Sequence, residues 1–304
     1  MRKLFKKSLV CLALSGVLVA SMTGCGKKEE VTVDSLFTKA QETSKTAKSI
    51  DMTIGLDVDG DLAFGKDTSM NIKLKADINS KAEVKKGAYV DGTVNMDMFG
   101  MSQEVPVKGY TDFSGDTVIS YVYDKDTDSW EKSEDDSAND MLTSLGDMKD
   151  LDFSSVYKSL TLAKEIGTYN DVQVYHVSGD IKGTDLSSII SKLDDSVKEK
   201  LKDVDLSSIV VGTDFYFSTK DSSMVGVSFD LSKTDFSKLT SELYKVEDDI
   251  TNTDETSTTE EPATTPESNG TSFKTCKVEI KVNSFDKYTF KVPDEVLNAV
   301  KEDK

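Results

Sequence analysis

The stretch at residues 124–135 has residue types and a spacing that could bind a metal ion. Acidic side chains occupy its positions 1, 3, 5 and 12, where an EF-hand loop carries the oxygen ligands of Ca²⁺. Position 6, however, is Ser129 where that loop needs glycine, and position 12 is Asp135 where it needs the longer glutamate. We therefore expect a solvated hairpin turn, with weak Ca²⁺ binding as the alternative.

His176 is the only histidine of the chain, and it lies in the strand-like segment VQVYHVSG. A zinc site or a relay between serine and histidine would depend on this one residue. The sequence contains no G-x-S-x-G nucleophile elbow and no glycine-rich phosphate loop. Aspartates are so abundant that any selected pair of carboxylates is uninformative. We expect a structural or surface histidine, no catalytic residues, no metal, no cofactor and no enzymatic activity.

The N-terminus has the three parts of a secretory leader. Four basic residues within the first seven positions precede an apolar run at 8–20, and a small-residue segment ends at Cys25. The run is too short to span a bilayer as a permanent helix. The Thr-Gly-Cys ending resembles a bacterial lipobox, with Met22 where leucine is usual. This resemblance implies that residues 1–24 are removed and that Cys25 carries a diacylglyceryl anchor. An ordinary secretory signal is the alternative.

The cysteine count excludes a disulfide within the mature chain, and the net charge excludes some classes of binding partner. Cys11 leaves with the leader and Cys25 carries the lipid, so Cys276 has no partner for a disulfide within the chain. The net charge is -18, and a chain this acidic is repelled by nucleic acid and by anionic headgroups. We expect a monomeric protein on the extracytoplasmic face of the cell membrane, held there by its N-terminal lipid, that binds no nucleic acid.

Long alternating segments predict the sheet that must position these residues. From Ile50 to Val58 every even position is apolar and every odd one is polar or glycine. The same period returns at residues 70–78, 88–98 and 105–113, and a hairpin is expected at 117–123 and 129–132. Further strands are expected at 172–177, 212–218, 224–231, 276–282 and 288–292. Such strands form an antiparallel sheet whose apolar face something must cover.

Segments of helical period are the candidates to cover that face. They lie at residues 34–50, 135–162, 185–201 and 236–244, and Pro293 opens a short closing helix. Residues 247–270 contain eight acidic residues and no basic one, so we expect a disordered loop. Since only 34 residues follow it, we place this loop between two neighbouring strands of one sheet. The predicted organisation is a tether at 25–33 and a single domain at 34–304.

The order of these elements resembles the LolA/LolB and LppX/LprG superfamily of bacterial envelope lipid-binding proteins, in its uncharacterised Gram-positive branch. The resemblance rests on the lipobox, the first helix, the long strands, the covering helices and the late segment FKVPDEV, and it spans essentially all of the mature chain. It implies an α+β fold in which a strongly curved antiparallel sheet of about 10–12 strands forms a half-open barrel covered by several α-helices. The acidic loop at 247–270 departs from that pattern.

The resemblance also implies an apolar cavity between sheet and helices that takes lipid or lipidated cargo. The expected lipid-binding residues are Met52, Ile54, Leu56, Met70, Ile72, Leu74, Val94, Met96 and Met98. Five of the ten methionines lie within the early strands, and flexible thioethers suit a surface that repacks around variable acyl chains. The alternative is ordinary core packing, which would make the molecule a cell-envelope scaffold or interaction module without a cavity.

Overall fold

The computed structural model describes residues 30–63, 69–115, 117–135, 154–187, 205–236 and 270–299. The predicted leader, Cys25 and nearly all of the acidic loop lie outside the described residues. So do most of the predicted helices at 135–162, 185–201 and 236–244.

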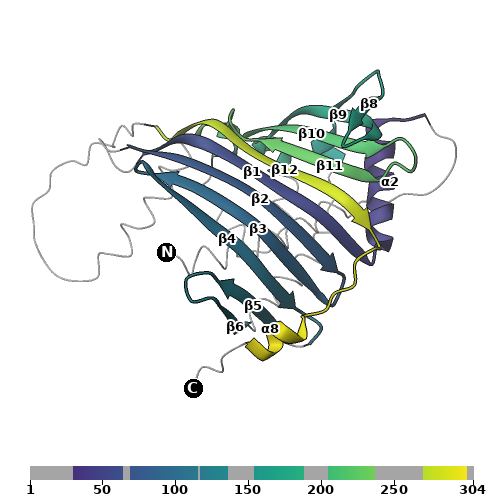
Figure 1. Ribbon diagram of the computed structural model, residues 1–304. Coiled ribbons are helices and arrows are strands. Elements are labelled where there is room, and N and C mark those ends of the chain that lie inside the picture. Colours follow the sequence, from purple (N-terminus) through teal and green to yellow (C-terminus); the bar gives the residue numbers. More distant parts are fainter. Residues whose placement is uncertain are drawn as a thin grey trace, which may run out of the picture.

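Twelve antiparallel strands form one sheet whose edges do not meet, in the order β6-β5-β4-β3-β2-β1-β12-β11-β10-β9-β7, with β8 paired to β9. The strands of the first half are β1 (Ser49–Ala63), β2 (Ser69–Glu83), β3 (Gly87–Met98), β4 (Met101–Asp112), β5 (Val118–Asp124) and β6 (Ser129–Asp135). Those of the second half are β7 (Thr161–Leu162), β8 (Gly167–Tyr169), β9 (Val172–Lys182), β10 (Val210–Ser218), β11 (Met224–Asp230) and β12 (Ser272–Phe285). The sheet is strongly curved (Figure 1), so the predicted fold class and strand number are confirmed.

Alternation along β1 fixes how the central strands pair. Ile54 lies between Ile280 of β12 and Ile78 of β2, so three apolar side chains meet on one face. On the other face Lys81 pairs with Asp51 at 3.2 Å and Lys75 with Asp57 at 3.6 Å. Exposed pairs of this kind stabilise little. A shift of the strand pairing by one residue, however, would expose the whole apolar stripe to water. The hydrophobic pattern therefore sets the register.

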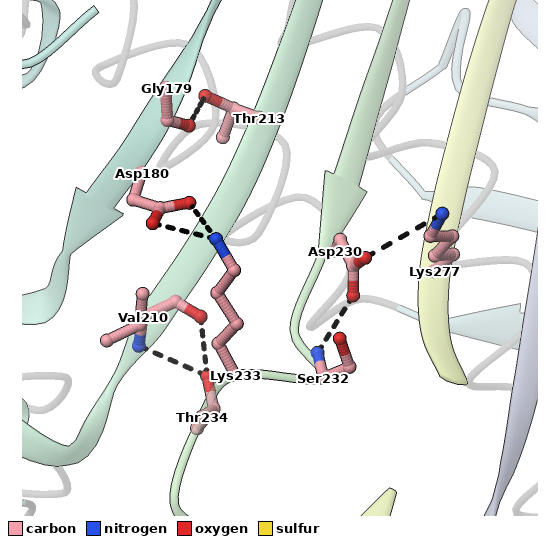
Figure 2. Close-up of polar contacts among 9 residues, drawn as sticks. All are labelled: Gly179, Asp180, Val210, Thr213, Asp230, Ser232, Lys233, Thr234 and Lys277. Atoms are coloured by element: carbon pink, nitrogen blue, oxygen red, sulfur yellow. Dashed lines mark hydrogen bonds and ion pairs between the residues drawn. The ribbon is translucent and has the colours of Figure 1, made fainter. Parts of the chain in front are cut away.

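The strands on either side of the acidic segment, β11 and β12, are hydrogen-bonded neighbours. Figure 2 shows how the chain is held where it leaves β11. Lys233 pairs with both carboxylate oxygens of Asp180 at 2.8 Å, and Thr234 exchanges two hydrogen bonds with the backbone of Val210. Because the free energy of loop closure grows slowly with length, a long connection is tolerated between strands whose ends are fixed.

Helix α2 (Val33–Thr46) covers part of the sheet. It begins with a capping box between Thr32 and Ser35 and buries Leu36, Phe37 and Ala40. The Phe37 ring stacks at 3.8 Å on Tyr157 of α4 (Ser154–Tyr157). In the part of the chain that the structure describes, α2 is the one long helix, so the prediction of several covering helices is wrong there. None of the described helices combines the length and apolar character needed to cross a bilayer.

The segment after β12 is not the strand predicted at residues 288–292. It runs as an extended strap from the end of β12 to α8 (Asp294–Ala299) beside β5 and β6 (Figure 1). The Phe290 amide donates to Glu83 Oε2 at 2.7 Å, and Val292 and Val296 pack against Tyr121. The apolar alternation that predicted a strand therefore arises because an extended segment packs on outward aromatic side chains, without pairing in the sheet.

Candidate functional site

The inward face, which we define as the surface of the sheet that α2 covers, takes every second residue of the central strands. The register aligns these residues in rows across β12, β1, β2 and β3. Three neighbouring rows are Ile280-Ile54-Ile78-Gly92, Val278-Leu56-Ala76-Val94 and Cys276-Val58-Leu74-Met96. All nine residues that the sequence marks as lipid-binding positions fall on the inward face.

Burial changes along this face. At the end nearer α2, which we call the closed end, Met52 is 0% exposed and Ile54 is 4% exposed. Toward the β3–β4 turn, which we call the open end, most inward side chains are half-buried, with Met70 and Val94 as buried exceptions. The half-buried ones are Leu56, Ile72, Leu74, Met96 and Met98. The open end therefore keeps apolar surface in contact with water, which is unfavourable unless something covers it.

The turn between β3 and β4 adds exposed apolar side chains at the open end. Phe99 is 73% exposed and Met101 is 69% exposed. Phe99 and Gly100 have φ values of 56° and 70°, as the two central residues of a type I′ turn require. Asn-Gly is the usual pair in such a turn, so Phe99 is unfavourable there both for its backbone and for its exposure.

The inward face is apolar and carries no charge where the structure describes it on β1, β2 and β3 and at the paired positions of β12. Its inward positions there hold aliphatic residues, methionine, glycine, Cys276, Phe273, Phe285 and one hydroxyl, that of Ser80. Burial raises the pKa of the Cys276 thiol, and the charge of Asp230 adds to the effect. The neutral, poorly reactive thiol is therefore favoured on this face.

His176 lies on the opposite, outward face. Its Nε2 is 2.8 Å from Asp214 Oδ1, and its ring stacks on Tyr216, which stacks on Tyr169. Burial raises the pKa of Tyr169, and its hydrogen bond to Glu279 adds to the shift. Among the described residues, no three His, Cys, Asp or Glu side chains are placed to hold a metal ion. The ring stack fastens the β8–β9 hairpin to the sheet, which is a structural role.

The stretch at 124–135 forms the β5–β6 hairpin. Asp124 accepts a hydrogen bond from the amide of Asp126 at 2.8 Å, and Asp128 accepts one from the Tyr123 hydroxyl. These carboxylates are thus used within the turn, as in the predicted solvated hairpin. The Trp130 ring packs against the Tyr110 ring on the outward face, with 5.7 Å between the ring centroids.

Sequence reasoning missed part of the inward face. Phe215 and Phe217 of β10 and Val177 of β9 belong to the same buried cluster as Met52. The alternation in GTDFYFS places both phenylalanines on one face, so the signal was present. It does not tell which face they share, because that depends on pairing between β9, β10 and distant β12.

Comparisons with known proteins show what the chain is similar to. No curated protein matches the sequence. Among solved structures, it is similar to LprF from Mycobacterium bovis, at 10% identity and a TM-score of 0.40, over 85% of this chain and 94% of that one. It is also similar to the lipoprotein LppX from Mycobacterium tuberculosis, at 10% identity and a TM-score of 0.38, over 85% and 97% of the two chains. A LolA superfamily protein from Nitrosomonas europaea matches at 10% identity and a TM-score of 0.22, over 88% and 97%.

A family described as of unknown function, DUF6612, matches residues 32–211. This match covers more than half of the 304 residues. The chain therefore belongs to the DUF6612 family.

Proposed function

We infer that this protein is an extracytoplasmic lipoprotein that binds lipid or lipidated molecules on its inward face. The observation that carries this proposal is the uncharged apolar surface left half-buried around Leu56, Leu74 and Met96. Binding would be non-covalent, because alkyl chains gain about 25 cal/mol for each Å² of apolar surface removed from water. No chemical step is required, and we propose no enzymatic activity.

The methionines at the open end favour a ligand-binding surface and not an ordinary packed core. Met96 and Met98 are half-buried at the last inward positions of β3. Unbranched thioether side chains adapt to ligands of variable shape at little conformational strain. A face built this way suits acyl chains that differ in length or branching.

The proposed anchor is Cys25, through a diacylglyceryl group. Two acyl chains give stable membrane attachment where one gives only marginal binding. The anchor would hold the domain at the extracytoplasmic face of the cell membrane, where lipid is the most abundant apolar ligand.

Native mass spectrometry tests the proposal. The mature chain from residue 25 onward, with Cys25→Ser to remove the anchor, is purified from its own host without detergent. We expect adduct masses that organic solvent releases as lipid. A single ligand-free mass, unchanged after incubation with neutral acyl lipid, would contradict lipid binding.

A second candidate is an envelope scaffold or interaction module whose interior is filled by its own side chains. The closed end favours it, because Met52 is completely buried in the cluster that includes Leu36 and Phe37 of α2. A crystal structure with the inward face filled along its whole length would support the scaffold.

A further inference from the structure

Ser80 interrupts the apolar pattern of the inward face. The other inward positions of β2, from Met70 to Ala82, are all apolar. Ser80 lies between Met52 of β1 and Val90 of β3, both buried. It is 0% exposed, and its hydroxyl has no hydrogen-bond partner among the described residues.

Several other buried hydroxyls of the described chain are engaged. Thr213 donates to the carbonyl oxygen of Gly179 at 2.9 Å (Figure 2), and Ser208 donates to the carbonyl oxygen of Asp205 at 2.6 Å. The other buried side-chain oxygen without a hydrogen bond in this part of the chain is Oδ1 of Asp59. The second oxygen of that carboxylate, however, is 3.9 Å from Lys73. An unpaired buried hydroxyl is costly, so the one on Ser80 needs a physical explanation.

We propose that Ser80 is the polar anchor of the lipid site and donates its hydroxyl hydrogen to an uncharged oxygen of the ligand, such as an ester or amide carbonyl. This inference rests on the proposed function and names the ligand class. Because the hydroxyl has no accessible surface, a ligand carbonyl reaches it only if the buried side chains beside it, such as Met52, move aside. A carbonyl bound there would satisfy the hydroxyl that the protein leaves unpaired, whereas a plain hydrocarbon would not.

The charge of the inward face sets the same preference. On β1, β2 and β3, and at the paired positions of β12, no inward residue is a lysine or arginine that could neutralise an ionised carboxylate. Burying an unpaired charge is far more unfavourable than burying a neutral ester. The site therefore selects neutral acyl esters and amides over free fatty acids in their ionised form.

The position of Ser80 also gives the direction of the bound chain. Ser80 lies at the closed end, and six residues along β2 Leu74 lies at the open end. At about 3.3 Å per residue the two are about 20 Å apart. The carbonyl therefore lies at the closed end, and the alkyl chain runs along β2 toward Leu74.

The test uses three matched probes on the mature chain carrying Cys25→Ser: methyl palmitate, hexadecane, and palmitate at pH 8. Each displaces the neutral fluorophore N-phenyl-1-naphthylamine. We expect the wild-type sequence to bind methyl palmitate at least about tenfold more tightly than palmitate. Ser80→Ala should lower the affinity for methyl palmitate about five- to tenfold. It should change the affinity for hexadecane by no more than about twofold. Its melting temperature should be unchanged or higher, because an unpaired hydroxyl is removed.

Ser208→Ala is the matched control, since Ser208 is a buried serine outside the sheet whose hydroxyl is already bonded within the protein. It should lower the melting temperature and leave the preference for methyl palmitate over hexadecane unchanged. Equal effects of Ser80→Ala on both probes, or none on either, would overturn the role of Ser80 while the lipid site stands. Failure of all three probes to bind would instead overturn the proposed function and this inference with it.

Discussion

The hydroxyl of Tyr169 donates a 2.8 Å hydrogen bond to Oε1 of Glu279, which lies 110 residues further along the chain. To reach it, the Tyr169 ring crosses the outward face and stacks at 4.1 Å on Tyr216 of β10. The ring occupies the space that a side chain at Gly226 would fill. One tyrosine of the short strand β8 is thereby fixed to β10, β11 and β12.

This contact predicts that Gly226→Ala destabilises the protein. Its Cβ would overlap the Tyr169 ring, so we expect the free energy of unfolding to fall by about 1–3 kcal/mol in urea denaturation. Gly55→Ala is the control, because its Cβ would meet no atom closer than 3.9 Å. Its effect should stay within about 0.5 kcal/mol. Equal stabilities of the two variants would show that the ring does not depend on Gly226.

The β3–β4 turn gives a prediction of the opposite sign. Phe99 has a φ of 56°, which a branched or bulky residue adopts at a steric cost that asparagine and glycine largely avoid. Phe99→Asn should therefore raise the free energy of unfolding by about 0.5–1 kcal/mol in thermal denaturation. Phe99→Ala lacks the short polar side chain through which asparagine tolerates a positive φ, so it should gain less. If alanine stabilised as much as asparagine, the gain would come from lost apolar exposure and not from the backbone.

Alkaline pH should weaken the attachment of the C-terminal strap. Burial raises the pKa of Tyr288 to about 12, and the neighbouring Tyr110 adds to the shift. A tyrosine in the unfolded chain ionises near pH 10. Between about pH 10 and 12 the unfolded state loses a proton that the folded state keeps, so the free energy of unfolding falls as pH rises. Below pH 10 this contribution is fully present.

Urea unfolding at pH 8, 10 and 11 measures this effect. Tyr288→Phe should have a flatter dependence than the wild type over that range and a similar stability at pH 8. Parallel curves for the two proteins would show that Tyr288 does not contribute to the alkaline loss.

Much of the fold could be predicted because it depends on local pattern. Alternation through β1 to β4 gave the strands and their inward residues, since a half-buried sheet requires period two. The same rule misassigned residues 288–292, because an extended segment packed on a sheet alternates like a strand within one. The pairing of β1 with β12 is set by distant residues and could not be derived from local pattern.

The candidate site was likewise predictable in part. Its nine residues could be placed on one face from the sequence, and the structure puts them there. Their different burial could not be predicted, because it depends on where α2 lies over the face. The role of Ser80 could not be predicted for a related reason. A sequence shows a polar residue in an apolar stripe, but it does not show whether the hydroxyl finds a partner in the fold.

A polar side chain at the open end should impair lipid binding with limited effect on folding. Leu74 is half-buried and lies on the inward face. Leu74→Gln should therefore lower the affinity for methyl palmitate about tenfold, measured by fluorophore displacement. Lys75→Gln on the outward face is the control, since Lys75 forms only an exposed pair with Asp57. It should bind like the wild type. Equal affinities for both variants would place the ligand elsewhere.

Photochemical cross-linking measures most directly where lipid binds. A palmitoyl ester with a diazirine in its acyl chain is irradiated with the mature chain carrying Cys25→Ser, and peptide mass spectrometry locates the adducts. We predict adducts at inward positions of β1, β2, β3 and β12, among them Leu56, Leu74 and Met96, that excess methyl palmitate abolishes. Adducts confined to outward positions, or labelling that excess ester leaves unchanged, would contradict lipid binding on the inward face.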